Sequence, residues 1–356
     1  MENSRVGWVD TAKGICIIFV VMMHSTIGVQ IAAGQEGWMN YVILFAWPFR
    51  MPDFFMISGL FLGLVIDRSW LRYIDRKVVH FAYFYVLWMT IQLVLKAPGI
   101  AAEEGAAGPL REYLLGFVQP YGTLWFIYML PLFFLFTRMV KGLPVWLILS
   151  WAALLEMLPV ETGSVIFDEF AQRYVFFFAG YAFASRIFDI ADWMAAHKRA
   201  ALAILAIWFV AEIAIVFAPV PDALQFINLG NNGFSGMPVI SLVLGGAGAL
   251  AIITVATLVT GLPYTRWLTW LGAHSIVVYL AFFLPMTVAR MVLTKSGIIG
   301  DVGTMSVLTL AAGVAGPVVL YHLVQSTGMG HFLFERPQWA IIDRPAARPA
   351  AIQPAE

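Results

Sequence analysis

Apolar stretches of about 20 residues recur along almost the whole chain, separated by short polar segments. A stretch of that length can cross a bilayer as a helix, because the hydrocarbon core is about 30 Å thick and an α-helix rises about 1.5 Å per residue. The pattern therefore predicts an all-α, polytopic membrane protein that forms a bundle of about ten transmembrane helices. The expected spans are 12–33, 43–66, 78–96, 121–140, 144–159, 168–187, 200–218, 237–260, 267–290 and 304–325.

Basic residues indicate how these spans are oriented. When the N-terminus is placed in the cytoplasm, 15 of the 21 Lys and Arg residues fall on the cytoplasmic side, and 6 fall on the other side or in the membrane. Cytoplasmic loops of membrane proteins are enriched in Lys and Arg. We therefore expect both termini to be cytoplasmic. Residues 1–334 form the predicted transmembrane domain, and residues 335–356 form a cytosolic tail rich in Pro and Ala.

Composition excludes several other classes of protein. Apolar residues make up 61% of the chain and charged residues only 12%, about half the share that is typical of soluble domains. The net charge of zero argues against a nucleic-acid partner, which would require a basic surface. The single cysteine, Cys16, excludes a disulfide framework, and no His or Cys spacing typical of a zinc site occurs, so we expect no metal.

The first apolar stretch carries a line of polar residues. Lys13 and His24 are about three helical turns apart, so they share one helix face, and Asp10 lies close to that face. His24 is then near the middle of the bilayer, where an ionisable group is costly unless it faces a cavity or a partner. A neutral imidazole in such a place can act as a general base. The structural alternative is that Asp10 caps the helix, Lys13 anchors it at the interface, and His24 hydrogen-bonds within the bundle.

A basic cluster follows the second apolar stretch. Arg68, Arg72 and Arg76 are spaced by four residues, which on a helix makes one stripe. Guanidinium groups in a stripe of this kind can bind phosphates. The alternative ligands are the headgroups of anionic lipids.

Other polar residues within apolar stretches are candidate site residues. Arg50 either pairs with Asp53 or faces a binding cavity. Glu156 and Glu212 each lie in an apolar run, where a carboxylate needs a partner. Either glutamate could orient His24, or it could couple a transporter to protons.

Four short motifs are spread over nearly the whole chain. They are Trp8-Val9-Asp10-Thr11-Ala12-Lys13-Gly14 with ten residues between Lys13 and His24, Met51-Pro52-Asp53-Phe54-Phe55-Met56-Ile57-Ser58-Gly59, Leu124-Trp125-Phe126, and Leu271-Gly272 with Ser275 and Tyr279-Leu280. Together they resemble the acyltransferase 3 family of bacterial inner-membrane proteins. Two positions depart from the family pattern: Lys13 stands where Arg is usual, and Phe282 stands where many members have His.

The resemblance implies a multi-pass protein of the bacterial cytoplasmic (inner) membrane. Such a protein transfers an acyl group, commonly acetyl, from cytosolic acyl-CoA to a hydroxyl of an extracytoplasmic glycan or similar acceptor. It implies a catalytic set of His24, Lys13 and Asp10, with His24 as general base or transient acyl carrier, and we expect Ser58 or a tyrosine to stabilise the oxyanion. The expected substrate-binding residues are Arg68, Arg72, Arg76, Arg50, Ser58, Gly59, Trp125 and Glu156.

Two other functional classes stay open at the level of sequence. One is a proton-coupled secondary transporter that uses His24, Glu156 and Glu212, and the other is a non-catalytic partner in envelope assembly. The expected partners are a small-molecule acyl donor such as acetyl-CoA, a hydroxylated acceptor and the lipid bilayer. A homo-oligomer is compatible with the sequence, which identifies neither the acceptor nor the acyl chain length.

Overall fold

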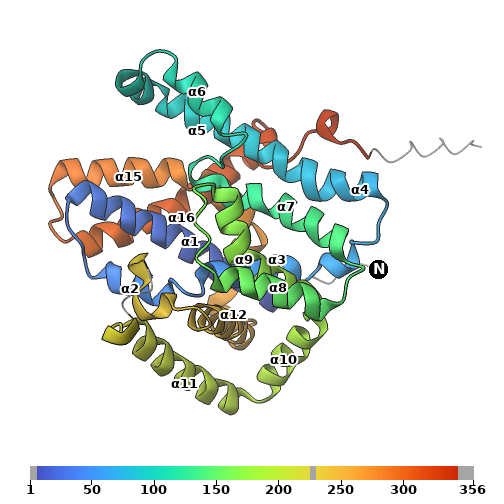
Figure 1. Ribbon diagram of the computed structural model, residues 1–356. Coiled ribbons are helices and arrows are strands. Elements are labelled where there is room, and N and C mark those ends of the chain that lie inside the picture. The colour runs from blue at the N-terminus through green and yellow to red at the C-terminus, as the bar shows by residue number, and fades with distance from the viewer. Residues whose placement is uncertain (1–5, 225–229, 344–356) are drawn as a thin grey trace, which may run out of the picture.

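Every regular element in the computed structural model is a helix within the part of the chain that it describes, residues 6–224 and 230–343 (Figure 1). The all-α prediction is therefore confirmed for these residues. The α-helices are α1 (Gly7–Ala33), α2 (Met39–Ala46), α3 (Arg50–Gly59), α4 (Trp70–Ile74), α5 (His80–Glu104), α6 (Gly108–Leu115), α7 (Trp125–Val140), α8 (Val145–Met157), α9 (Val165–Ala182), α10 (Ala184–Ala196), α11 (Lys198–Val216), α12 (Ile240–Val259), α13 (Arg266–Ala273), α14 (Ser275–Ala281), α15 (Phe283–Ser296) and α16 (Val302–Thr327). The shorter elements are the 3₁₀ turns η1 (Leu62–Leu64), η3 (Gly122–Leu124), η4 (Asp222–Leu224), η5 (Gly230–Gly236), η6 (Pro263–Thr265), η7 (His331–Leu333) and η8 (Gln338–Ala340), and the π-helical turn η2 (Asp75–Val79).

Several helical segments are suited to cross a membrane. The described residues hold six segments that are long and apolar enough to cross a membrane. Two bent pairs, α9 with α10 at 75° and α14 with α15 at 52°, also have the required composition, and the number rises to eight if each bent pair is one span. The protein is therefore an integral membrane protein, whereas the count of ten spans and the orientation of the termini stay predictions. The six segments are Gly7–Ala33, Trp70–Glu104, Gly122–Val140, Lys198–Val216, Ile240–Val259 and Val302–Thr327.

Pro48 divides the stretch 43–66, which we predicted to be one continuous span. α2 ends at Ala46 and α3 begins at Arg50, with a turn between them. Proline has no N–H to donate within a helix, and its ring disfavours the helical conformation of the preceding residue. The prediction of an unbroken helix is wrong here, and the break leaves Arg50 at the first position of a buried helix.

α1 is the central helix and packs against α3, α12, α13, α15 and α16. Its close approach to α13 depends on Gly272, because a Cβ atom there would overlap the carbonyl oxygen of Asp10. Gly14 of α1 faces the Leu268 carbonyl in the same contact. Small residues let membrane helices pack backbone against backbone. This contact fixes the rotation of α1 about its axis and thereby the direction in which His24 points.

A second contact between helix backbones holds α3 in place. A Cβ atom at Gly59 would overlap the Phe177 carbonyl oxygen on α9, and one at Gly180 of α9 would overlap the Met56 carbonyl oxygen on α3. Residues 50–57 of α3 are all buried. Gly59, which was predicted to bind substrate, thus lies in a contact between helices.

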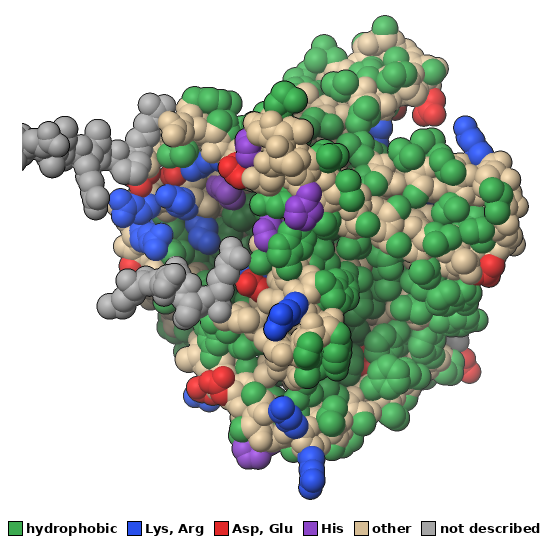
Figure 2. All heavy atoms as spheres, turned by 180° about the vertical axis from the view of Figure 1, so that it is seen from behind, with side chains coloured by type: hydrophobic (Ala, Val, Ile, Leu, Met, Phe, Trp, Pro, Cys, Tyr) green, Lys and Arg blue, Asp and Glu red, His purple; other side chains and the backbone are tan. Residues whose placement is uncertain are grey.

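Large apolar side chains cover much of the outer surface. In Figure 2 a group of Lys and Arg side chains gathers on one side, whereas much of the remaining face is apolar. On α11, Leu202, Ile207 and Val210 are all at least 60% exposed. Exposed apolar surface of this extent is unusual for a soluble protein and suits contact with lipid.

The segment 335–343, predicted to begin the cytosolic tail, folds back onto the region that joins α4 to α5. Arg336 donates to the Asp75 carboxylate at 2.7 Å and to the Asp75 backbone carbonyl at 2.8 Å. The backbone N–H of Ile342 donates to the same carboxylate, also at 2.8 Å. The rest of the predicted tail, 344–356, lies outside the described residues. The described end of the chain is therefore anchored to the body of the protein.

Candidate functional site

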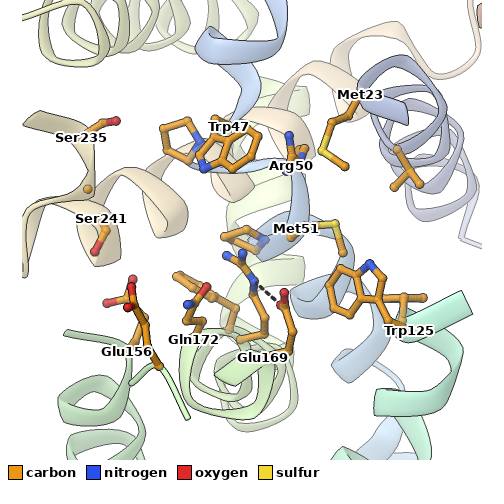
Figure 3. A pocket seen from close by; sticks show the side chains of 18 of the residues that line it. Met23, Trp47, Arg50, Met51, Trp125, Glu156, Glu169, Gln172, Ser235 and Ser241 are labelled. Carbon is orange, nitrogen blue, oxygen red and sulfur yellow. Dashed lines mark hydrogen bonds and ion pairs between the residues drawn. The ribbon is translucent and has the colours of Figure 1, made fainter. Parts of the chain in front are cut away.

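A cavity of about 500 Å³ lies among α1, α3, α7, α8, α9 and the segment that leads into α12 (Figure 3). This volume is within the range of small-molecule sites. Four predicted site residues that are far apart in sequence share the cavity: His24, Arg50, Trp125 and Glu156. The other polar lining residues are Thr123, Glu161, Glu169, Gln172, Arg173, Ser235, Ser241 and Tyr279, and the other aromatic ones are Trp47, Phe126 and Phe176.

His24 reaches the cavity from the middle of α1. Its side chain is half-buried, and its ring stacks on Phe282, between α14 and α15, with the ring centroids 5.5 Å apart and the planes at 30°. The described residues provide no hydrogen-bond partner for the imidazole nitrogens. A molecule in the cavity can therefore reach imidazole nitrogens that no described residue hydrogen-bonds.

Arg50 lies beside His24 on the cavity wall. Its side chain is only 6% exposed, and its guanidinium group stacks on Trp47 at 4.0 Å from the ring centroid. The Nε and Nη1 atoms have no hydrogen-bond partner among the described residues. The predicted pairing of Arg50 with Asp53 is absent from the described ion pairs, and the buried Asp53 carboxylate instead faces the Cys16 thiol. Arg50 is therefore a buried cation with unused donors.

Charged side chains of α9 and α8 form another wall of the cavity. Arg173 donates to Glu169 at 3.1 Å, one helical turn away on α9. Gln172 lies next to this pair, and Glu156 points from the end of α8 toward Ser241 (Figure 3). The wall thus presents carboxylate and amide oxygens, which accept hydrogen bonds from hydroxyl groups.

The remaining wall combines aromatic and hydroxyl groups. The Tyr279 hydroxyl donates to the Thr123 carbonyl at 2.5 Å and accepts from the Phe126 N–H at 3.2 Å. The Thr123 hydroxyl has no hydrogen-bond partner among the described residues. Tyr279 therefore connects α14 to the start of α7, whereas Thr123 keeps a donor free.

Lys13 and Asp10 lie elsewhere, about three turns before His24 on α1. They form an ion pair of 3.6 Å, and the charges of Lys13 and Arg68 both interact with Lys77. The structure therefore separates the predicted catalytic set into two places. His24 faces the cavity, whereas Lys13 belongs to a basic region near η2.

The predicted basic stripe is interrupted. Arg68 precedes the helix, which begins at Trp70, and Arg76 lies in the π-helical turn, so the three arginines do not share one regular helix face. Arg72 pairs with Asp343 at 2.9 Å. The stripe is wrong as a geometric prediction, because the helix starts too late and the π-turn changes its register. All three side chains are exposed in the same region.

Ser58 and Glu212 do not reach the His24 cavity. The Ser58 hydroxyl donates to the Phe54 carbonyl of its own helix at 2.8 Å. Glu212 is buried on α11, beside Trp208. The structure therefore leaves Ser58 and Glu212 outside the lining of this cavity, whereas Glu156 does line it.

Two polar residues of α9, Glu169 and Arg173, line the cavity although neither was among the predicted site residues. The available signal was the spacing of four residues between opposite charges at the start of an apolar helix. Thr123, Gln172 and Ser241 carried no comparable signal.

These observations define an all-helical integral membrane protein in which a histidine of a central helix faces a polar cavity. Residues 6–322 match the family model described as an acyltransferase domain. The chain therefore belongs to the acyltransferase 3 family and is a membrane acyltransferase. No solved structure matches the chain.

Proteins from three bacteria are similar to this chain in sequence. Nodulation protein NolL of Sinorhizobium fredii is 26% identical over 255 residues, which cover 70% of this chain and 68% of the relative. Nodulation protein NolL of Mesorhizobium japonicum is 24% identical over 189 residues, covering 52% and 49%. Inner membrane protein YcfT of Escherichia coli is 28% identical over 158 residues, covering 38% and 44%. The last two matches span about half of each relative or less.

Proposed function

We propose that this membrane acyltransferase moves an acyl group, commonly acetyl, from acyl-CoA to a hydroxyl of a glycan or similar acceptor. The observation that carries the proposal is the position of His24. Its imidazole faces a cavity that also contains Arg50 and the Glu169–Arg173 pair, and no described residue hydrogen-bonds the ring. A free imidazole next to a binding cavity is suited to take the proton of an acceptor hydroxyl.

The lining supports a polyhydroxylated acceptor. Hydroxyl groups can donate to the carboxylates of Glu156 and Glu161, and the apolar face of a sugar ring can pack on Trp47 or Trp125. Val20, Met23, His24 and Ile27 line the cavity from the second half of α1. With the N-terminus in the cytoplasm of a bacterial cell, this half of α1 is the more distant from the cytosol, which supports an acceptor that enters from the extracytoplasmic side of the inner membrane.

Charge at the other end of α1 supports a donor that carries phosphates. Lys13, Arg68 and Lys77 interact electrostatically there, and the exposed Arg72 and Arg76 lie in the same region. Positive groups of this kind bind phosphates through charge-assisted hydrogen bonds. We place the phosphates of acyl-CoA in this region, with the thioester extending along α1 toward His24.

Removal of the imidazole tests the proposal. Loss of a general base typically lowers the rate by about 10²- to 10⁴-fold. We expect His24→Ala to lose acyl transfer from labelled acetyl-CoA by this factor in the full-length protein reconstituted in lipid. His197→Ala, which changes a histidine outside the cavity at the α10–α11 junction, is the matched control. Transfer at the wild-type rate in a folded His24→Ala protein would refute the assignment.

A second measurement separates the two roles open to His24. If His24 carries the acyl group, labelled acetyl-CoA without an acceptor should leave a label on the wild-type protein and none on His24→Ala. If His24 acts only as a base, the protein should stay unlabelled while acetyl-CoA is still consumed with an acceptor. Substrate flux driven by a proton gradient, with no need for acyl-CoA, would identify a transporter instead.

A further inference from the structure

Acyl transfer produces an oxyanion, and the residues first considered for its stabilisation are already engaged. The Ser58 hydroxyl donates to the Phe54 carbonyl and lies outside the lining of the His24 cavity. The Tyr279 hydroxyl donates its one proton to the Thr123 carbonyl. Neither group can donate to an oxyanion in this arrangement.

Arg50 has free hydrogen-bond donors, which Ser58 and Tyr279 lack. It lines the same cavity as His24, it is 6% exposed, and two of its guanidinium nitrogens have no partner among the described residues. The stacking on Trp47 at 4.0 Å holds the plane of the guanidinium group in place. The charges of Glu169 and Asp53 act on Arg50, but neither carboxylate forms an ion pair with it among the described residues. A buried cation with unused donors is costly unless a ligand fills them. The missing partner is therefore expected to arrive with the substrate or to form during the reaction.

The other charges in the cavity favour a transient anion over a permanently anionic acceptor. Glu156, Glu161 and Glu169 all line the cavity, and among the described residues only Glu169 of these three forms an ion pair, with Arg173. An acceptor that carried its own carboxylate or phosphate would meet these side chains in the same confined space. A transient oxyanion, in contrast, forms only on the carbonyl oxygen of the reacting thioester, beside His24. The charge of Arg50 acts on the His24 imidazole, so Arg50 lies near this position.

We propose that Arg50 is a catalytic residue that binds the thioester oxygen as it becomes an oxyanion, with the free Thr123 hydroxyl as a second donor. This inference rests on the proposed function. The acceptor hydroxyl loses its proton to His24 and its oxygen bonds to the thioester carbon, while the carbonyl π electrons move to the oxygen that faces Arg50. Collapse of this intermediate breaks the C–S bond, and the CoA thiolate takes the proton from the imidazolium. The products are the acyl ester and CoA thiol.

Hydrolysis of acetyl-CoA tests this role without a known acceptor, because water then replaces the acceptor hydroxyl and the same oxyanion forms. The assay follows thiol release by the full-length protein in lipid, with Arg50→Gln as the test variant. Loss of one oxyanion donor lowers kcat by about 10²- to 10³-fold, and we expect this drop with little change in the KM for acetyl-CoA. Arg111→Gln removes an arginine from an exposed pair with Glu104 on α5 and α6, and it should keep wild-type kinetics.

Two further variants guard against a folding defect. Arg50→Lys keeps the charge but loses the planar fork, so it should retain part of kcat. Arg50→Ala leaves room for free guanidinium, and added guanidinium chloride at millimolar concentration should restore part of kcat. Rescue of this kind shows that the variant is folded and that the missing group acts at the reacting centre.

The possible outcomes separate this inference from the proposed function. Wild-type kcat in Arg50→Gln overturns the inference while leaving acyl transfer intact. Normal hydrolysis with impaired transfer to a glycan assigns Arg50 to acceptor binding and also overturns it. A wild-type protein that neither hydrolyses nor transfers the acetyl group of acetyl-CoA overturns the proposed function, and the inference with it.

Discussion

The imidazole of His24 stacks on the ring of Phe282, and the two residues belong to segments far apart in the chain. Phe282 is fully buried at the junction of α14 and α15. The stack is a contact that limits rotation of the His24 side chain. The direction of the proposed base therefore depends on a residue that does not itself line the cavity.

We predict that Phe282→Leu lowers kcat for acyl transfer by roughly 10- to 100-fold, because a misplaced catalytic group loses much of its advantage of orientation. The KM for acetyl-CoA should change little, and Phe282→Tyr, which keeps an aromatic ring, should recover part of kcat. Phe167→Leu, at an exposed position of α9, is the control. Steady-state kinetics check the prediction, and an unchanged kcat in Phe282→Leu would contradict it.

The contact between α1 and α13 predicts a difference between two glycines. Gly272→Ala places a methyl group against the Asp10 carbonyl oxygen, whereas a Cβ atom at Gly246 of α12 meets no atom within 4 Å. Overpacking typically costs about 1–3 kcal/mol. We expect Gly272→Ala to lower the thermal unfolding temperature in detergent, and Gly246→Ala to leave it unchanged or raise it slightly. Equal behaviour of the two variants would argue against the close approach.

The buried pair of Arg336 and Asp75 predicts that the C-terminal segment contributes to stability. The Asp75 side chain is fully buried, and that of Arg336 is 6% exposed. Removal of Arg336 leaves the buried Asp75 carboxylate with only the longer ion pair to the exposed Arg76, at 3.9 Å, and loss of one partner of a buried ion pair typically costs about 3–5 kcal/mol. We expect Arg336→Ala to lower the free energy of unfolding by this amount and to make residues 335–343 sensitive to protease.

An exposed ion pair provides the control for that experiment. Arg111 and Glu104 lie at 2.6 Å with side chains 62% and 36% exposed, and pairs of this kind contribute at most about 1 kcal/mol. Arg111→Ala should therefore change neither unfolding nor proteolysis. If Arg336→Ala behaves like this control, the anchoring role of the C-terminal segment is wrong.

Asp301 predicts a dependence of stability on pH. Its carboxylate accepts from the Thr304 N–H at 2.6 Å and from Trp38 at 3.1 Å, which joins the start of α16 to the α1–α2 connection. Hydrogen bonds from Thr304 lower the pKa of Asp301. A carboxyl group whose pKa is lower in the folded state stabilises the fold above its ordinary pKa of about 4, and this stabilisation is lost as the pH falls through the lower, folded-state value.

The corresponding measurement compares wild-type protein with Asp301→Asn. Between about pH 5 and pH 3 the wild type should lose more thermal stability than the variant, because asparagine can still cap the helix but does not titrate. Parallel curves for the two proteins would contradict the role of Asp301.

The sequence allowed the helical class, the membrane location and the central histidine to be predicted, because these depend on local patterns. Hydropathy over about 20 residues is enough to identify a spanning helix. The spacing of Lys13 and His24 on one helix was enough to place them at different depths on the same side. The local sequence pattern thus predicts both which segments are helices and which residues share a helix face.

The composition of the cavity could not be predicted, because it depends on contacts between helices. Glu156 and Glu212 look alike in sequence, yet only Glu156 lines the cavity. Ser58 and Gly59 belong to a recognisable motif, but their neighbours on α9 and α3 give them structural roles. The π-helical turn likewise displaced Arg76 from the expected face.

The origin of the cavity walls has a consequence for how such proteins can diversify. His24 and Arg50 lie on helices packed tightly into the bundle, whereas much of the opposite wall comes from residues 158–161 and 235–238, in connections between α-helices. Connections tolerate insertions and replacements far better than packed helices do. Descendants of one ancestral sequence can thus acquire new acceptors by changing these two connections, with the reacting groups inherited intact.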